Sequence, residues 1–176
     1  ESKELAELMG IIAGDGGINN EWQLVITLNS QSDIEYSKYI YKLLRKLFNI
    51  GVAVRKRPNQ NALVLVCSST SLVDFLVEKG AVRGNKILGG LDAPFWVKDN
   101  PNYEKTFIRG LVDTDGCLYI HKHTVKGKLR KDIGFCFTNN SENIIRVAVK
   151  ILNDIGLNPH ISNKQNRVYL YGKEQI

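Results

Sequence analysis

Apolar residues recur along this chain with two different spacings, one typical of helices and one typical of strands. Leu5, Leu8, Met9 and Ile12 follow an i, i+3, i+4, i+7 pattern, which places them on one face of a helix. Over residues 22–28 every second residue is apolar, as in a strand with one buried face. In the first half these patterns predict helices over 4–14, 33–48 and 72–78, strands over 22–28, 52–57 and 63–67, and a turn at Asn19-Asn20.

The same order of patterns returns in the second half. Asn100 followed by Pro101 is a helix start signal and predicts a helix that runs to about Thr114. The patterns then predict strands over 118–123 and 133–138 around a basic loop at 124–131, a helix over 142–154, and strands over 157–162 and 167–171. Each half therefore reads helix, hairpin, helix, hairpin, which indicates a tandem duplication.

The duplication defines three parts of the chain. We expect an N-terminal lobe over 1–80, a linker over 81–102 that is rich in Gly and Pro, and a C-terminal lobe over 103–176. The last helix of the first lobe has no counterpart before Ile176, so the second lobe either lacks that helix or is cut short.

Two segments, "LMGIIAGDGG" at 8–17 and "IRGLVDTDGC" at 108–117, are similar to each other. Each belongs to a predicted helix that carries a stripe of small residues at i, i+4, i+8. The stripes are Ala6, Gly10 and Gly14 in the first copy and Thr106, Gly110 and Thr114 in the second. Small residues allow helices to approach closely, so we expect these two helices to pack on each other.

Each segment ends in an acid, Asp15 or Asp115, at the predicted C-terminus of its helix. That end carries partial negative charge, so a carboxylate is unfavourable there by about 0.3–1 kcal/mol when exposed. One Asp-Gly pair alone is a common way to open a turn. Two copies on helices that pack together favour a shared cation site, and carboxylates with main-chain carbonyls are hard oxygen ligands suited to Mg²⁺.

Composition narrows the class of protein only a little. No apolar run approaches the roughly 20 residues of a membrane span, so we expect no membrane partner. The three cysteines, Cys67, Cys117 and Cys136, are odd in number and lack a CxxC spacing, which indicates reduced thiols in an intracellular protein. Of the net charge of +6, residues 1–102 carry +1 and residues 103–176 carry +5. Charge alone leaves open both a merely soluble surface and a polyanionic partner.

Both segments resemble the LAGLIDADG motif of homing endonucleases, in the single-chain form with two motifs. The matching stretches are "LMGIIAGDG" at 8–16 and "IRGLVDTDG" at 108–116, and the sequence that leads into the second copy is also similar. The resemblance implies an α+β fold of two pseudosymmetric αββαββ lobes, a saddle of antiparallel sheets on DNA, packed through the two motif helices.

The resemblance also implies an activity and a location. The expected activity is a monomeric, Mg²⁺-dependent, site-specific double-strand DNA endonuclease from a group I intron or an intein, which leaves 3′ overhangs. Mn²⁺ or Ca²⁺ would substitute in binding. The alternative is a cleavage-inactive relative that binds nucleic acid, either an RNA maturase that binds intron RNA or a DNA-binding regulator. The expected location is the cytoplasm, or an organelle matrix in a eukaryotic host.

Site residues are carried over position by position. Asp15 and Asp115 would bind the metals, with the carbonyls of Gly14 and Thr114 assisting. The family's basic residue before the second motif best matches Lys86, which is either catalytic or a solvated linker lysine.

The chain departs from the family's pattern at two places. The earlier acid of the motif is Ala13 in one copy and Asp113 in the other, and we expect Asp113 to pair with Arg109 at i−4. The family's water-organising glutamine falls on Leu28 in "ITLNS" and on Asn139 in "FTNNS", with Asn29 or Gln31 as substitutes in the first lobe.

Strand alternation selects the residues that would face DNA. Arg, Asn, Gln and His suit base edges, whereas lysines and arginines in the basic loop suit phosphates. The expected DNA-facing residues are Asn19, Gln23, Thr27, Arg55, Arg57, Tyr119, His121, His123, Lys126, Lys128, Arg130, Lys131, His160, Arg167, Tyr169 and Tyr171. His121 and His123 lie on the same face of one strand and could bind zinc. No third His or Cys stands at a ligand spacing, so we favour DNA contact. Leu118 and Ile120, on the opposite face, are expected to point inward.

Overall fold

The structure is a computed structural model that describes residues 1–162 and 166–171. It divides into two compact units, Glu1–Thr114 and Asp115–Ile176. The helix of the second motif, which the sequence assigns to the C-terminal lobe, therefore belongs to the first unit except for its last residue. No helix among the described residues is both long and apolar enough to cross a membrane.

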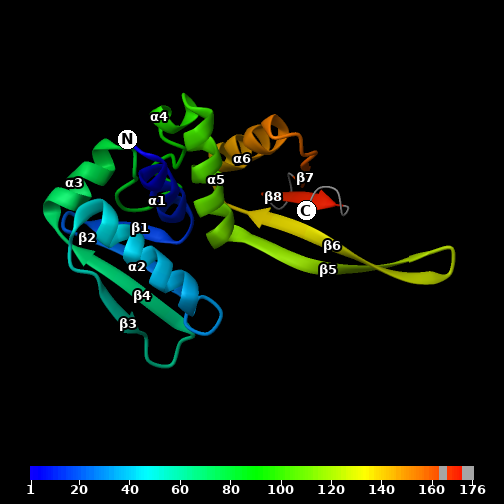
Figure 1. The fold of residues 1–176 in the computed structure, drawn as a ribbon, viewed down its shortest axis with the longest axis horizontal. Coiled ribbons are helices and arrows are strands. Elements are labelled where there is room, and N and C mark those ends of the chain that lie inside the picture. The colour runs from blue at the N-terminus through cyan, green and yellow to red at the C-terminus, as the bar shows by residue number, and fades with distance from the viewer. Residues whose placement is uncertain (163–165, 172–176) are drawn as a thin grey trace. The chain divides into compact units, whose positions relative to one another are not determined.

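The first unit contains a four-stranded antiparallel sheet and five helices (Figure 1). Its elements are α1 (Lys3–Gly14), β1 (Gly16–Asn20), β2 (Gln23–Asn29), α2 (Ile34–Phe48), β3 (Ala53–Lys56), β4 (Ala62–Ser68), α3 (Thr70–Glu78), α4 (Phe95–Lys98) and α5 (Pro101–Asp115). Ser2 and Ser69 accept hydrogen bonds from the first turns of α1 and α3, which satisfies one backbone donor in each helix. Asn49, in the left-handed conformation, ends α2.

The second unit repeats the sheet and one helix. Its elements are β5 (Gly116–Val125), β6 (Lys128–Thr138), α6 (Glu142–Asp154), β7 (His160–Ser162) and β8 (Arg167–Tyr171). The strand orders β1-β2-β4-β3 and β5-β6-β8-β7 are equivalent, and every pairing between these strands is antiparallel. The predicted α+β fold with a repeated αββαββ order is confirmed.

Alternation along the central strand of the first sheet explains how the helices are held. Leu24, Ile26 and Leu28 are buried, whereas Gln23, Val25 and Thr27 between them are only half-buried. The buried set packs under the helices, since α2 contacts β4 and α3 contacts β2. The half-buried residues of β2 therefore lie on the face opposite these helices.

The linker after α3 docks onto the first sheet. Ile18 of β1 forms a parallel bridge with Arg83, and the Gly84 N–H donates to the Ile18 carbonyl at 2.7 Å. The linker thus extends the edge of β1, and its next turn carries Lys86.

Two local predictions are wrong. The turn of the first hairpin lies at Glu21-Trp22, because β1 continues through Asn19 and Asn20. The stretch 124–131 is not a loop, because β5 and β6 continue to a two-residue turn at Lys126-Gly127. Both turn residues have positive φ, 50° and 73°, which matches the twist of a tight hairpin and lets the ladder run to its end.

Candidate active site

Helices α1 and α5 cross at a pair of glycines. A Cβ added at Gly10 would lie 2.1 Å from the carbonyl oxygen of Phe107, and one at Gly110 would lie 2.2 Å from the carbonyl oxygen of Glu7. Each glycine thus meets the carbonyl three residues before the other, which is a reciprocal, pseudo-twofold contact. The expected close packing of the two helices is confirmed at the centre of the small-residue stripes.

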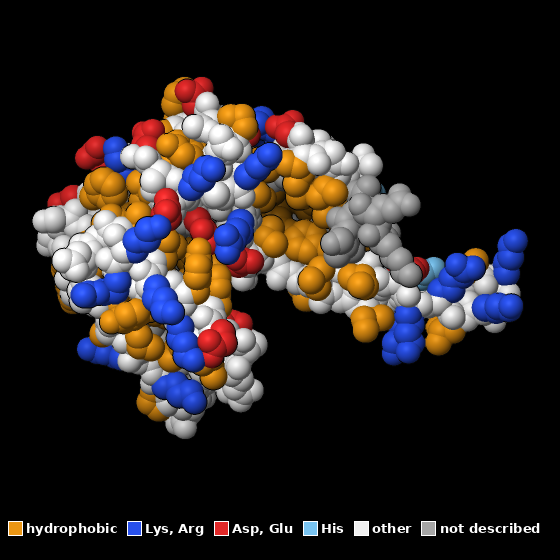
Figure 2. Space-filling model, in the orientation of Figure 1, with side chains coloured by type: hydrophobic (Ala, Val, Ile, Leu, Met, Phe, Trp, Pro, Cys, Tyr) orange, Lys and Arg blue, Asp and Glu red, His pale blue; other side chains and the backbone are white. Residues whose placement is uncertain are grey.

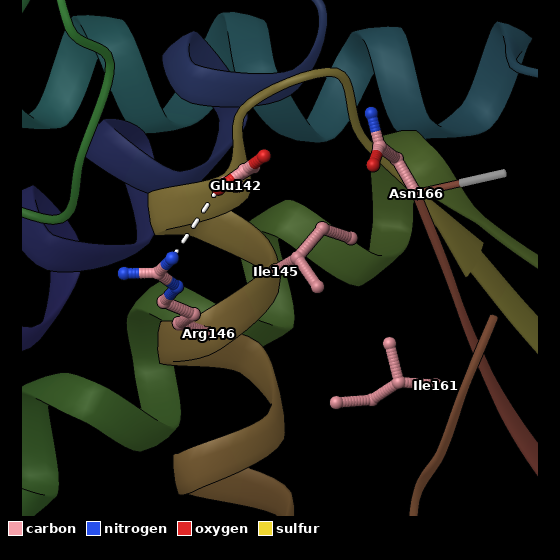
Figure 3. Close-up of a pocket in the computed structure, with 5 residues that line it drawn as sticks. All are labelled: Glu142, Ile145, Arg146, Ile161 and Asn166. Carbon is pink, nitrogen blue, oxygen red and sulfur yellow. Dashed lines mark hydrogen bonds and ion pairs between the residues drawn. The ribbon is translucent and has the colours of Figure 1, made fainter. Parts of the chain in front are cut away.

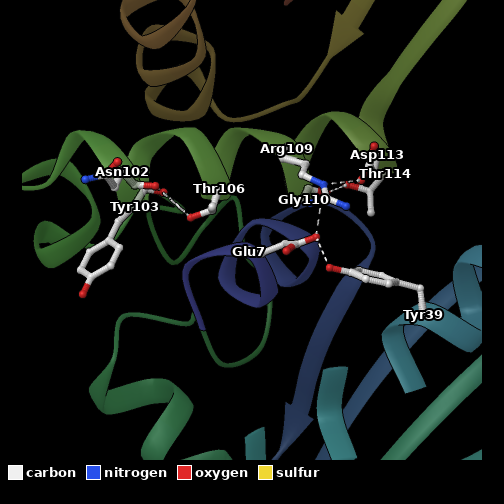
Figure 4. A network of polar contacts seen from close by, with 9 residues as sticks. All are labelled: Glu7, Tyr39, Asn102, Tyr103, Thr106, Arg109, Gly110, Asp113 and Thr114. Atoms are coloured by element: carbon white, nitrogen blue, oxygen red, sulfur yellow. Dashed lines mark hydrogen bonds and ion pairs between the residues drawn. The ribbon is translucent and has the colours of Figure 1, made fainter. Parts of the chain in front are cut away.

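Further along the stripe of α5, threonine hydroxyls bond to their own helix (Figure 4). Thr106 donates to the carbonyls of Asn102 and Tyr103, and Thr114 to those of Gly110 and Leu111. These hydroxyls are satisfied within the helix, so threonine behaves here as a small residue.

Asp15 forms the C-cap of α1. Its N–H donates to the Ile11 carbonyl at 3.0 Å, and its own carbonyl accepts from the Thr27 N–H of β2 at 3.1 Å. The acid therefore sits where the helix passes directly into the sheet.

Lys86 binds the end of α1. Its Nζ donates to the carbonyls of Ile12, Ala13 and Gly14 at 3.2, 2.9 and 2.6 Å. An ammonium at this position offsets the negative end of the helix dipole, to which the Asp15 charge adds. Lys86 is therefore not a solvated linker lysine, and its catalytic role stays a prediction.

Asp115, the last residue of α5, is held by a different side chain. Asn139 donates from Nδ2 to Asp115 Oδ2 at 2.6 Å, and its Oδ1 accepts from the Ser141 N–H at 2.8 Å. Asn139 is only 9% exposed, and its counterpart Leu28 is 4% exposed. Leucine has no donor, so the equivalent contact to Asp15 cannot exist. The motif alignment located this pair, but only the structure shows the bond.

A polar network lies beside the helix crossing (Figure 4). Glu7 is 4% exposed, accepts from the Tyr39 hydroxyl at 2.8 Å, and lies 3.5 Å from Nε of Arg109. Arg109 also lies 3.9 Å from Asp113, so the expected i−4 pair is present. Burial raises the pKa of Asp113, and Arg109 opposes that shift. Sequence reasoning missed Glu7, whose signal is an acid among the apolar residues of the predicted helix.

The helix-free face of the first sheet carries the predicted polar side chains. Arg55 pairs with Val64, which pairs with Thr27 on the other side, so all three share this face. Arg57 continues the alternation and is exposed, as is Asn19 of β1. Gln23 lies on the same face of β2, at the opposite end of the strand from the turn after β3.

The corresponding face of the second sheet is more aromatic. A Cβ at Gly134 would lie 2.6 Å from the Tyr119 ring, so that ring covers the glycine. Tyr169 and Tyr171 stack with ring centroids 5.7 Å apart. The ladder places His160 opposite Tyr169, and Arg167 opposite Ser162.

The two histidines share a face with an acid. His121 pairs with Asp132, and His123 Nε2 lies 3.4 Å from Asp132 Oδ2. The described residues contain no group of three or more His, Cys, Asp or Glu side chains that could hold a metal ion. A metal at Asp15 or at Asp115 would therefore need other ligands, such as main-chain carbonyls, water or phosphate oxygens.

The hairpin of β5 and β6 extends past β8, which pairs only with Gly134–Thr138 (Figure 1). Lys and Arg side chains follow it to its tip (Figure 2). Alternation places Lys128 and Arg130 on the face of His121, whereas Lys131 lies on the opposite face and Lys126 in the turn. This arrangement can contact an extended polyanion.

The expectation that Leu118 and Ile120 point inward and are buried is wrong. Each is 66% exposed, although both lie on the face opposite Tyr119 as alternation requires. The counterpart Ile18 is fully buried, and it bridges to the linker that follows α3. No such segment covers this part of the second sheet among the described residues.

A pocket of about 390 Å³ lies between α6 and the last hairpin (Figure 3). The Glu142–Arg146 ion pair and the side chains of Ile145, Ile161 and Asn166 line it. It contains none of the residues predicted for metal or DNA, so we assign it no part in the site.

Comparisons with known proteins agree with this architecture. Residues 102–176 match the family model described as a LAGLIDADG-like domain. No curated protein matches the chain significantly.

Several solved structures share the fold. The structure of I-DmoI in complex with DNA and Ca has a TM-score of 0.61 at 18% identity, over 96% of this chain and 82% of that one. Mesophilic variants of the homing endonuclease I-DmoI give 0.60 at 18% identity, over 96% and 87%. The meganuclease I-SmaMI bound to uncleavable DNA gives 0.58 at 9% identity, over 94% and 77%. The fold is therefore that of the LAGLIDADG homing endonucleases.

Proposed function

We propose that this protein is a divalent-metal-dependent endonuclease that cleaves double-stranded DNA at a long, non-palindromic site. It acts as a monomer and originates from an intron or an intein. The fold supports the proposal, because similar structures were solved with DNA and with Ca or Mn. The presence of both motif acids favours a cleaving enzyme over a binding protein that has lost cleavage.

The observation that carries the proposal is the reciprocal crossing at Gly10 and Gly110. Each glycine is followed five residues later by an acid at the end of the same helix, Asp15 or Asp115. If each Asp-Gly pair served only to form a turn, the same spacing would not need to recur on two helices that cross at equivalent positions. An enzyme that cuts both strands of one DNA duplex would use such a repeated arrangement, with one acid for each strand.

The donor set fits Mg²⁺, because carboxylates and main-chain carbonyls are hard oxygen ligands. Asp15 and Asp115 would hold the metals, with the carbonyls of Gly14 and Thr114 as assisting ligands. The Gly14 carbonyl also accepts from Lys86, so its metal contact would share that oxygen. Bound metal supplies an activated water and stabilises the leaving oxygen of the phosphodiester.

The chain's own residues orient this site. Asn139 fixes the Asp115 carboxylate through the 2.6 Å contact, and Lys86 fixes the last turn of α1 ahead of Asp15. Because Leu28 cannot repeat the Asn139 contact, the two half-sites differ in how their acid is held. We infer that the two DNA strands are cut at different rates.

The two sheet faces read different bases. Arg55 and Arg57 in the first sheet offer guanidinium groups suited to guanine, whereas the matching strand positions of the second sheet hold His160 and Ser162. The hairpin lysines bind phosphates and position the duplex. Unlike faces predict unlike half-sites, so the target is not palindromic.

A cleavage screen tests the function. The protein is incubated with a randomised duplex library and Mg²⁺, and the cut ends are sequenced. We expect one enriched sequence with 3′ overhangs. Asp15→Asn and Asp115→Asn should each abolish double-strand cleavage and leave DNA affinity within about threefold, since the lost carboxylate repels phosphate rather than binding it.

Asp154→Asn is the matched control, because Asp154 also ends a helix but is exposed. It should cleave normally. Enrichment of a bound sequence without cleavage in Mg²⁺ or Mn²⁺ would show a binding protein instead. Absence of both binding and cleavage would refute the proposal.

A further inference from the structure

Two of the three cysteines lie directly opposite each other on neighbouring strands. Cys117 of β5 pairs with Cys136 of β6, and both thiols are free. Side chains of directly opposed residues emerge on the same face of a sheet. The third cysteine, Cys67, lies on β4 opposite Leu24 and is 1% exposed.

The ladder fixes the spacing of this pair. The two-residue turn at Lys126-Gly127 makes Val125 and Lys128 a hydrogen-bonded pair, and the register runs without a bulge to Gly116. Alternation then makes Cys117 and Cys136 a hydrogen-bonded pair as well, for which Cα atoms lie about 5.5 Å apart. Disulfides have Cα separations of about 5.5–6 Å, so the Cα atoms already lie within bridging distance. The Cβ atoms of a hydrogen-bonded pair lie about 5.5 Å apart, wider than the roughly 3.5–4.5 Å of a relaxed disulfide, so the bond would be strained and therefore easily reduced.

The two thiols differ in access. Cys117 is exposed, and its Sγ lies 3.6 Å from the Leu118 carbonyl oxygen. Cys136 is half-buried, with Sγ 3.7 Å from the Thr138 hydroxyl. An external reagent therefore reaches Cys117 first, and Cys136 is the neighbour that can resolve the product.

We propose that Cys117 and Cys136 form a reversible redox modification site, in which a small-molecule disulfide of the glutathione type oxidises the dithiol to a cross-strand disulfide. The Cys117 thiolate attacks one sulfur of the oxidised reagent and releases one reduced thiol, leaving a mixed disulfide. The Cys136 thiolate then attacks the Cys117 sulfur and releases the second reduced thiol. Two protein thiols are oxidised, one reagent disulfide is reduced, and the two protons pass to the released thiols.

The pair also lies at a place where a glutathione adduct on Cys117 would affect DNA binding. Cys117 follows Asp115 by two residues and shares its face with Tyr119, and Cys136 lies opposite Tyr169. Only the effect on DNA, and not the redox site itself, rests on the proposed function, in which that face contacts DNA. An anionic glutathione on Cys117 would then confront phosphates and lower DNA affinity by about tenfold or more.

Thiol chemistry without DNA tests the site itself. Wild-type protein, equilibrated with oxidised glutathione, is alkylated with maleimide under native conditions, digested and analysed by mass spectrometry. We expect a peptide linked through Cys117 and Cys136, which dithiothreitol separates. Cys136→Ser should instead retain one glutathione on Cys117. Burial raises the pKa of the Cys67 thiol to about 11, so Cys67 should stay reduced and Cys67→Ser should behave as wild type.

Two results would overturn the inference at different points. Separate alkylation of Cys117 and Cys136 after oxidation, or a link through Cys67, would refute the dithiol site. DNA affinity of glutathionylated Cys136→Ser, measured on the sequence from the cleavage screen, tests the consequence. An unchanged affinity with the adduct in place would refute the contact of this face with DNA, while the redox site would stand.

Discussion

The variant Gly110→Ala tests the close crossing of α1 and α5. The added Cβ would lie 2.2 Å from the Glu7 carbonyl oxygen and 3.1 Å from the Ile11 nitrogen. Both are backbone atoms of α1, so no side-chain rotation relieves the overlap. Because non-bonded heavy atoms prefer about 3.5 Å or more, the helices must separate by about 1 Å.

The cost follows from two opposing effects. Overpacking a well-filled contact costs about 1–3 kcal/mol. Alanine in a helix interior is favoured over glycine by about 1 kcal/mol. Since the overlap is with backbone, we take the upper end of the first range and expect a net loss of about 2 kcal/mol. For a chain of this length that lowers the melting temperature by about 4–8 °C.

Thermal and urea unfolding followed by circular dichroism measure this loss. Gly10→Ala should show the same loss, because its Cβ would lie 2.1 Å from the Phe107 carbonyl. The double variant should lose less than the sum, since one separation relieves both overlaps. Gly51→Ala, where a Cβ meets nothing within 4 Å, should change stability by less than about 0.5 kcal/mol. Wild-type stability of Gly110→Ala would refute the crossing.

Two further predictions concern the acids. Asn139→Leu removes the donor to Asp115 and should lower the free energy of unfolding by about 1–3 kcal/mol in urea, whereas Asn140→Leu, at an exposed neighbour, should change it little. Equal losses would contradict the 2.6 Å contact. Burial raises the native pKa of Asp113, with Arg109 opposing, so the wild type loses stability as pH rises from the unfolded pKa through the native one. Asp113→Ala lacks this carboxyl group and should not show that loss. The melting temperature of the variant minus that of the wild type should therefore increase between pH 3 and pH 7. A difference that is constant over this range would contradict the shift.

Two mispredictions have different causes. The stretch 124–131 looks like a loop because it is basic and contains glycine, yet Lys126 and Gly127 adopt the positive φ angles of a tight hairpin turn. Leu118 and Ile120 look buried because they alternate with polar residues. Alternation assigns a residue to a face of the sheet, but whether anything covers that face is decided by other parts of the chain.

The sequence by itself determined the repeated elements, the packing of two small-residue helices and the face on which each strand residue lies. These features follow from periodicity, which depends on neighbours within a few positions and is therefore written locally. Only the tertiary structure decided which groups surround each acid. Lys86 meets the carbonyls of α1 more than 70 residues away, and Asn139 meets Asp115 across 24 residues. Such contacts depend on the path of the chain through linker and sheet, and no local spacing encodes that path.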